Sequence, residues 1–236
     1  MEKKYKLTEE TREWRGHTLH RIEALKDFGD VKAGDKGGWI EREENLSQGG
    51  LAWVSDSACV SGEARVSGDA RVSGSARVSG SAWVSDSACV SGEARVSGEA
   101  WVSGKARVSD LACVSDSARV SGSALVSGEA WVSDSACVSD SACVSGEAWV
   151  SDSACVSGKA RVSDLADYIV FKNWWSSGRY FTWTRSNNMW AVGCFYGTGE
   201  ELIKKAYADS EKSGREYKRV VKYVESILAD EKENKE

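Results

Sequence analysis

The sequence predicts an all-β solenoid, a parallel β-helix of three sheets and about six coils, with a small cap module at each end. One hexapeptide, A-x-V-S-[G/D]-x, repeats nineteen times from Ala52 to Leu165 without an insertion or deletion, and so strict a period is typical of repeat architectures. Ala and Val stand two residues apart in every hexad, so both face the same side of an extended strand. The fifth position holds only Gly or Asp, which suit a bend.

The hexad V-S-[G/D]-x-A-x resembles the repeat of left-handed parallel β-helices. The resemblance implies that three hexads form one triangular coil, with Val inside each face and Ala where the triangle narrows. At a strand spacing of about 4.8 Å the rod is then roughly 30 Å long. A right-handed solenoid remains the main alternative, because periodicity alone does not fix handedness.

The flanking segments lack the repeat and predict separate modules. We expect a β-rich amino-terminal cap over residues 1–51, the solenoid over 52–166, a carboxy-terminal cap over 167–229 and a charged, frayed tail over 230–236. An open β-helix exposes unpaired backbone groups at both ends, so the two caps should cover them.

Short strands are expected in the amino-terminal cap at KYKLT and HTLHRIEAL, followed by turns rich in Gly and Asp. In the carboxy-terminal cap, residues 179–185 and 189–196 predict a β-hairpin. Capping boxes that start at Thr198 and Ser213 predict two helices, and the second helix carries an apolar stripe. We expect the large aromatic residues of this cap to pack as a core rather than to bind a ligand; they are Trp174, Trp175, Phe181, Trp183 and Trp190.

The first fifty residues also resemble a known family. Tyr5–Glu9, Asp27–Gly34, Gly37–Ile40 and Asn45–Gln48 are similar to the amino-terminal segment of YdcK-type hexapeptide-repeat proteins, which occur in bacteria and their phages. That family is described as acyltransferase-like, without an established substrate. The resemblance therefore implies a transferase-like fold and indicates little about activity.

Composition excludes several classes of partner. A net charge of −5 argues against binding of nucleic acid or anionic lipid, and no apolar run approaches the ~18 residues of a membrane span. The chain begins without the apolar segment of a signal peptide. Six of the seven cysteines occupy the outward second position of a hexad, which favours a reducing cytoplasm. No spacing typical of a metal site occurs, so neither metal nor cofactor is expected.

The sequence offers little for catalysis. Hexapeptide acyltransferases use a His as general base, but the repeat contains no His and no inserted loop. His17 and His20 lie three apart in the amino-terminal cap, so on a strand they face opposite sides, and we interpret both as surface residues. A carbonic anhydrase of this fold needs three His ligands, and the chain has two. We therefore lean against an enzyme.

The second position of the hexad faces outward and holds only Arg, Trp, Cys and one Leu. Neutral drift of a duplicated repeat explains this set, because the four codons interconvert by single base changes. Alternatively, exposed Trp and Arg form a binding surface. Five Trp are expected to face solvent, and stacking between successive coils allows ring and cation–π contacts. The candidate binding residues are Arg65, Trp83, Trp101, Arg119, Trp131 and Trp149.

The function that the sequence favours is a non-catalytic binding or scaffold protein that self-associates, or binds a protein partner, through its Trp/Arg columns. The alternative is an acyltransferase-like enzyme that uses acyl-CoA, which rests on the family resemblance alone. An ice-binding prism fits poorly, because such a surface needs flat ranks of Thr or similar residues.

Overall fold

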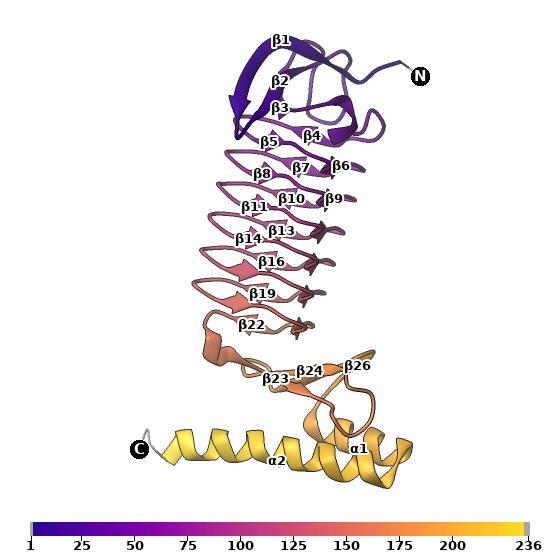
Figure 1. Ribbon diagram of the computed structural model, residues 1–236, viewed down its shortest axis with the longest axis vertical. Coiled ribbons are helices and arrows are strands. Elements are labelled where there is room, and N and C mark those ends of the chain that lie inside the picture. The colour runs from indigo at the N-terminus through magenta and orange to yellow at the C-terminus, as the bar shows by residue number, and fades with distance from the viewer. Residues whose placement is uncertain (1, 234–236) are drawn as a thin grey trace.

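The structure is a three-sided rod with a module at each end (Figure 1). It is a computed structural model that describes residues 2–233, apart from the side chains of Leu165 and Lys232. The predicted solenoid is confirmed: each hexad provides one two-residue strand, and the nineteen strands β4 to β22 alternate among three parallel sheets. Hydrogen-bonded neighbours are three strands apart in the chain, so each turn uses three hexads.

Each sheet displays one column of second-position residues. The first column consists of β4 (Trp53–Val54), β7 (Arg71–Val72), β10 (Cys89–Val90), β13 (Arg107–Val108), β16 (Leu125–Val126), β19 (Cys143–Val144) and β22 (Arg161–Val162). The second column consists of β5 (Cys59–Val60), β8 (Arg77–Val78), β11 (Arg95–Val96), β14 (Cys113–Val114), β17 (Trp131–Val132) and β20 (Trp149–Val150). The third column consists of β6 (Arg65–Val66), β9 (Trp83–Val84), β12 (Trp101–Val102), β15 (Arg119–Val120), β18 (Cys137–Val138) and β21 (Cys155–Val156).

The interior of the rod contains only the two small aliphatic residues of the hexad. Every Val from Val54 to Val162 and every Ala from Ala52 to Ala160 is at most 1% exposed. In-register pairing places each Val beside the Val of the next turn, as Val102 lies beside Val84 and Val120. The prediction that Val faces inward in every hexad is therefore confirmed.

The corners explain why the fifth position is restricted to Gly and Asp. From Asp56 to Gly158 this residue has φ between 55° and 69°, a left-handed conformation that few side chains adopt. At several corners Asp also stabilises the next turn, because its carboxylate accepts a backbone N–H eighteen residues later. Asp56 Oδ2 accepts from Gly74 N at 3.0 Å and Asp140 Oδ2 accepts from Gly158 N at 3.1 Å.

The amino-terminal module is richer in strand than the sequence predicts. It contains β1 (Tyr5–Trp14), β2 (His17–Ala24), β3 (Lys36–Ile40) and the short 3₁₀ helix η1 (Glu43–Asn45). β3 lies in the segment expected to form turns, and it pairs in parallel with β5 of the rod. Ile40 and Leu46 continue the inward Val columns, opposite Val60 and Val66. An irregular turn thus precedes the hexads, and the solenoid has about seven turns rather than six.

Side chains of this module pair the free backbone groups at the amino-terminal end of the rod. Asn45 Nδ2 donates to Ala64 O at 2.8 Å, and Lys4 Nζ donates to Ala52 O at 2.7 Å. Lys4 is 1% exposed, and burial lowers the pKa of its amine to about 8. The module therefore caps the rod through specific hydrogen bonds.

The carboxy-terminal module is a four-stranded antiparallel sheet followed by two helices. Its strands are β23 (Tyr168–Lys172), β24 (Tyr180–Thr184), β25 (Met189–Val192) and β26 (Phe195–Gly197), which follow the one-turn 3₁₀ helix η2 (Leu165–Asp167). The predicted hairpin is confirmed as β24 and β25. The sequence did not indicate β23, and residues 189–196 bend at Gly193 into two strands.

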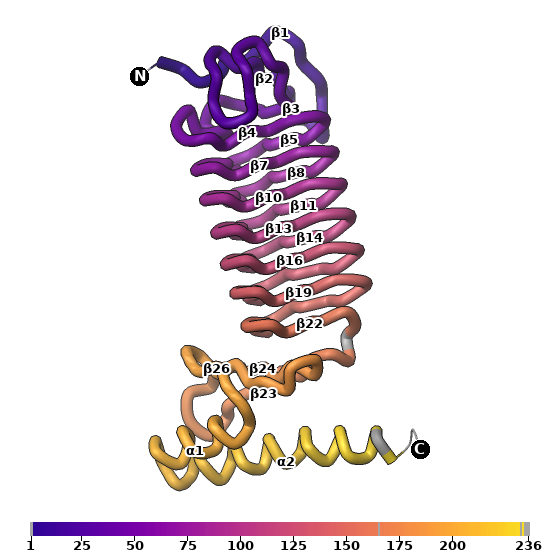
Figure 2. The backbone as a smooth tube through the Cα atoms, turned by 180° about the vertical axis from the view of Figure 1, so that it is seen from behind, coloured from indigo at the N-terminus to yellow at the C-terminus, as the bar shows by residue number. Residues whose placement is uncertain are grey.

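The helices α1 (Gly199–Asp209) and α2 (Glu211–Glu233) lie on the side of the sheet away from the rod (Figure 2). The capping box at Thr198 is confirmed. The one at Ser213 is wrong: α2 begins earlier, and Ser210 Oγ accepts from Ser213 N at 3.1 Å. The segment predicted as a frayed tail from 230 is helical to Glu233, and residues 234–236 lie outside the described residues.

A second core of aromatic residues holds this module together. Trp175, Phe181, Trp183 and Trp190 pack with Tyr217, Val221 and Val224 of α2, which confirms their expected packing role. Trp174 is the exception, with 72% of its surface exposed. Thr182 connects the module to the rod, because its Oγ1 accepts Cys155 N at 2.9 Å. No helix in the described part of the chain is long and apolar enough to cross a membrane.

Candidate binding surface

The first candidate site is a pair of stacked indoles on the third column. Trp83 and Trp101 are register partners, with ring centroids 5.3 Å apart and planes inclined by 28°. They are 42% and 41% exposed. Trp101 Nε1 donates to Ser85 Oγ at 3.4 Å, so the indole leans toward the preceding turn. The pair presents a fixed apolar surface in the middle of a face of serines.

Arg65 and Arg119 flank this pair in register, as the sequence predicts. The cation–π contacts that we expected are absent, since no described arginine of the third column lies over either ring. Instead, a shallow cavity of about 290 Å³ lies beside Trp83 and Arg65. The arrangement is a two-ring stack with a positive charge at each end.

A second indole pair lies on the second column. Trp131 and Trp149 are register partners with centroids 5.5 Å apart and planes inclined by 14°, and they are 46% and 48% exposed. Their Nε1 atoms donate to Ser115 Oγ and Ser133 Oγ at 3.3 and 3.4 Å. The two pairs thus occupy different faces of the rod, with five hexads, or one and two-thirds turns, between Trp101 and Trp131.

The serines under the indoles belong to the candidate surface, and the sequence reasoning missed them. Each stands sixteen residues before its Trp, at the fourth position of a hexad in the preceding turn. The spacing is the 18 residues of one turn minus two, because the serine follows the outward residue by two positions. The period of the repeat was therefore enough to predict that the two residues lie close together. The hydroxyl holds the indole against the face, which limits the rotamer entropy lost on binding.

The expectation of five solvent-facing tryptophans is wrong for Trp53. It is 8% exposed, because Phe28 of the amino-terminal module packs edge-on against it at 5.3 Å. The same module covers Cys59, which is 3% exposed and accepts a hydrogen bond from Arg12. The outward positions of the first two hexads therefore belong to the junction with the cap.

The two histidines make separate contacts in the amino-terminal module. His17 Nδ1 lies 3.1 Å from Glu41 Oε2, a carboxylate that also accepts Gly62 N at 2.7 Å. Partial burial raises the pKa of Glu41, but the hydrogen bonds from Gly62 and His17 outweigh it and hold the pKa below its usual value. His20 Nδ1 lies 3.3 Å from Thr8 O. His17 thus has an acidic partner that the sequence did not indicate, and that partner, Glu41, links the cap to the rod through Gly62.

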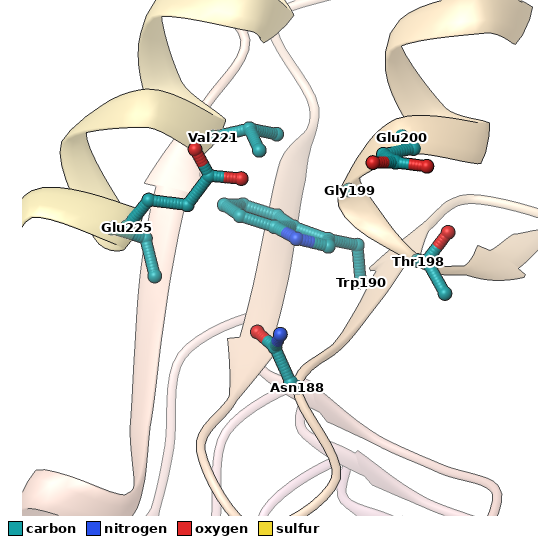
Figure 3. A pocket seen from close by; sticks show the side chains of 8 residues that line it. Asn188, Trp190, Thr198, Gly199, Glu200, Val221 and Glu225 are labelled. Carbon is teal, nitrogen blue, oxygen red and sulfur yellow. The ribbon is translucent and has the colours of Figure 1, made fainter. Parts of the chain in front are cut away.

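A cavity of about 250 Å³ opens between α1, α2 and β25 (Figure 3). Glu200 and Glu225 direct carboxylates to two sides of the Trp190 ring, with Asn188 below it. Such a setting favours a small organic cation. Trp190, however, is 2% exposed and packs on Phe171 and Phe181, so most of its surface serves the core.

No group of three or more His, Cys, Asp or Glu suited to a metal ion occurs among residues 2–233. All seven cysteines are free thiols. Cys137 and Cys155 are register partners, as their 18-residue spacing predicts.

Comparison with known proteins supports the resemblance to YdcK-type proteins, although the family match lies in the repeat and not in the amino-terminal segment that suggested it. Residues 64–80 and 70–86 match the family described as YdcK beta solenoid repeat. The chain is also 39% identical over 66 residues to a protein of Escherichia coli (strain K12) named "Uncharacterized acetyltransferase YdcK". That stretch covers 25% of this chain and 20% of the relative. Within the solenoid, residues 64–86 are thus similar to the YdcK repeat.

Proposed function

We propose that this YdcK-like β-solenoid is a non-catalytic binding protein that self-associates through its two stacked tryptophan pairs, Trp83 with Trp101 and Trp131 with Trp149. The observation that carries the proposal is two stacked pairs of indoles, three of the four rings bonded to a serine, which are nonetheless 41–48% exposed. Large exposed apolar patches on soluble proteins commonly mark interaction surfaces, and Trp is enriched at the energetic centres of interfaces.

The expected affinity is modest. A Trp side chain buries roughly 150–250 Å², so each pair offers roughly 200 Å² of exposed ring. When a pair on one copy meets a pair on another, the burial contributes roughly 10 kcal/mol at ~25 cal/mol per Å². Association itself costs about 4–15 kcal/mol. We therefore expect a concentration-dependent assembly, in which Arg65 and Arg119 contribute polar contacts at the rim.

The position of the pairs on different faces shapes the assembly. One pair facing its own counterpart on a second copy gives a closed dimer. A second pair on another face allows a further copy to bind, so larger assemblies follow at high concentration. Other protein partners are the alternative occupants of the same surfaces.

The test is the molar mass from light scattering over a range of protein concentrations. We expect Trp83→Ser with Trp101→Ser, and separately Trp131→Ser with Trp149→Ser, to reduce the mass at an unchanged melting temperature after correction for mass action. The matched control is Trp174→Ser, which removes an exposed Trp outside the columns and should leave the mass unchanged. A wild-type protein that stays monomeric at every concentration overturns self-association.

The alternative is an acyltransferase-like enzyme, and its support is the name of the Escherichia coli relative. A general base must reach the proton it removes, while His17 and His20 contact Glu41 and Thr8 within the cap. We expect His17→Ala and His20→Ala to leave any acetyl transfer from acetyl-CoA unchanged. Loss of such transfer in either variant would favour the enzyme. We also propose a cytoplasmic location, which the free thiols support.

A further inference from the structure

The third column contains a pair of cysteines that differs from every other cysteine of the repeat. Cys137 on β18 and Cys155 on β21 are direct register partners in adjacent parallel strands. The other outward cysteines have Arg, Trp or Leu as register partners; Cys143, for example, lies between Leu125 and Arg161. Both thiols of the pair are free and partly accessible.

The spacing of the two residues suits a covalent link. Neighbouring strands lie about 4.8 Å apart, and disulfides join residues whose Cα atoms are about 4.4–6.8 Å apart. Both side chains leave the same face, because the second position of each hexad points outward. A bond between the two sulfurs therefore requires side-chain rotation and only a small change in the backbone.

The two thiols are chemically unequal. The interaction of the Cys137 sulfur with the neighbouring Cys155 thiol lowers the pKa of Cys137 to about 7 and raises that of Cys155. Arg119, the register partner of Cys137 on the other side, adds a positive charge that also favours the thiolate. Since the thiolate is the nucleophile, Cys137 should react first and Cys155 second.

We propose that Cys137 and Cys155 form a reversible oxidation site that reacts with hydroperoxides. The Cys137 thiolate attacks one peroxide oxygen: an S–O bond forms, the O–O bond breaks, and the leaving oxygen takes a proton to give water or an alcohol. The Cys155 thiol then attacks the sulfenic sulfur, so that an S–S bond forms, the S–O bond breaks and water leaves. The two thiols lose two electrons and the peroxide gains them. A small thiol reductant reverses the link by exchange.

The oxidised pair has a defined structural effect. β21 is the last strand of the third column, and its Cys155 N is bound by Thr182 of the carboxy-terminal module. The disulfide closes a short loop across the last two turns of this face. It therefore fastens the end of the rod that carries the module, without involving either tryptophan pair.

The experiment treats the reduced full-length chain with one equivalent of hydrogen peroxide and maps the products by thiol counting and peptide mass spectrometry. We expect two of the seven thiols to disappear, a Cys137–Cys155 linked peptide to form, and dithiothreitol to restore both thiols. Cys155→Ser should instead accumulate a sulfenic acid at Cys137 that dimedone traps. Cys143→Ser is the matched control, because it removes an outward thiol with no cysteine partner and should still form the link.

A second measurement reports proximity independently of oxidation rate. Phenylarsine oxide, which bridges two close thiols, should bind the reduced chain with one-to-one stoichiometry, and Cys137→Ser and Cys155→Ser should each abolish this binding. Equal oxidation of Cys89, Cys113, Cys143 and Cys137, or disulfides mainly between chains, would overturn the proposal. So would arsenical binding that persists in the single variants.

Discussion

Trp53 and Trp131 occupy the same position in two copies of the hexapeptide, yet they lie in different environments. Trp53 is covered by the amino-terminal module and is 8% exposed, whereas Trp131 stacks on Trp149 in a bare face and is 46% exposed. The backbone, the inward Val and the following Ser are alike at the two sites. The difference shows that the repeat determines which way a side chain points, while the flanking modules determine whether it is buried.

The interior shows the opposite behaviour. Val54 and Val132, the neighbours of those two tryptophans, are both fully buried. The inward column is the same from one end of the rod to the other because each turn repeats the contacts of the last. Substitutions of inward residues should therefore cost similar free energies of unfolding along the whole rod, whereas the cost of outward substitutions should differ from site to site.

The largest effect should come from a charge on the inside. Val102→Asp places an unpaired carboxylate between Val84 and Val120, and such a group costs several kcal/mol unless it is paired. We expect loss of the β-sheet circular dichroism signal of the rod. The matched control is Trp101→Ser, the outward neighbour, which should keep the signal and the melting temperature. A folded Val102→Asp variant would contradict the packed interior.

Truncating one tryptophan under the cap and one on the open face tests the comparison between the two environments. Trp53→Ala removes a ring buried against Phe28 and Tyr5, and Trp to Ala changes in cores cost about 3–5 kcal/mol. Trp131→Ala removes a half-exposed ring and should cost no more than about 0.5 kcal/mol, the low end for one aromatic pair. Chemical denaturation followed by circular dichroism measures both. Equal losses at the two sites would show that the cap does not determine burial.

The strict six-residue period was enough to predict the rod, its inward residues and its corners. The irregular turn before it was hidden, because Ile40 and Leu46 are out of phase with the series of Val residues and their pairing with Val60 and Val66 is a long-range contact. The start of α2 was predicted too late for a local reason: Ser210 and Ser213 are equally good caps by residue type. Their hydrogen bond shows that Ser210 is the cap.

The candidate surface was predicted in part. The register of the columns follows from the period, so the pairing of Trp83 with Trp101 and of Trp131 with Trp149 could be read from spacing. The direction of the side chains could not be predicted from the spacing. The indoles lean onto serines of the preceding turn, and Arg65 and Arg119 make no cation–π contact with them. Burial of Trp53 also escaped, since it depends on a loop more than twenty residues away in the chain.

The carboxy-terminal end of the rod provides a smaller test of capping. Thr182→Val keeps the shape of a fully buried side chain and leaves Cys155 N without its acceptor. An unpaired buried donor costs about 1–3 kcal/mol, so the midpoint of denaturation should fall. Thr182→Ser retains the hydroxyl and serves as the control that should restore most of the loss. If both variants melt alike, the bond does not stabilise the junction.

The smallest expected effect concerns the amino-terminal end, where a buried amine rather than a hydroxyl pairs with the rod. Burial first, and the nearby Lys26 second, lower the pKa of Lys4 from 10.5 to about 8. Between these two values the unfolded chain binds more protons than the folded chain, so the free energy of unfolding contributed by Lys4 must rise with pH. Above pH 10 the raised pKa of Tyr5, which is buried beside it, acts in the opposite direction.

The informative window is therefore pH 8 to 10. Over it we expect the wild-type protein to gain about 1–2 kcal/mol relative to Lys4→Met, since each pKa unit corresponds to about 1.4 kcal/mol. Lys6→Met is the matched control, because it removes the same charge from a side chain that is 50% exposed. Its denaturation midpoint should follow the wild-type pH dependence. Parallel curves for wild type and Lys4→Met would mean that the amine remains solvated, and that the amino-terminal end of the rod is covered less tightly than the carboxy-terminal end.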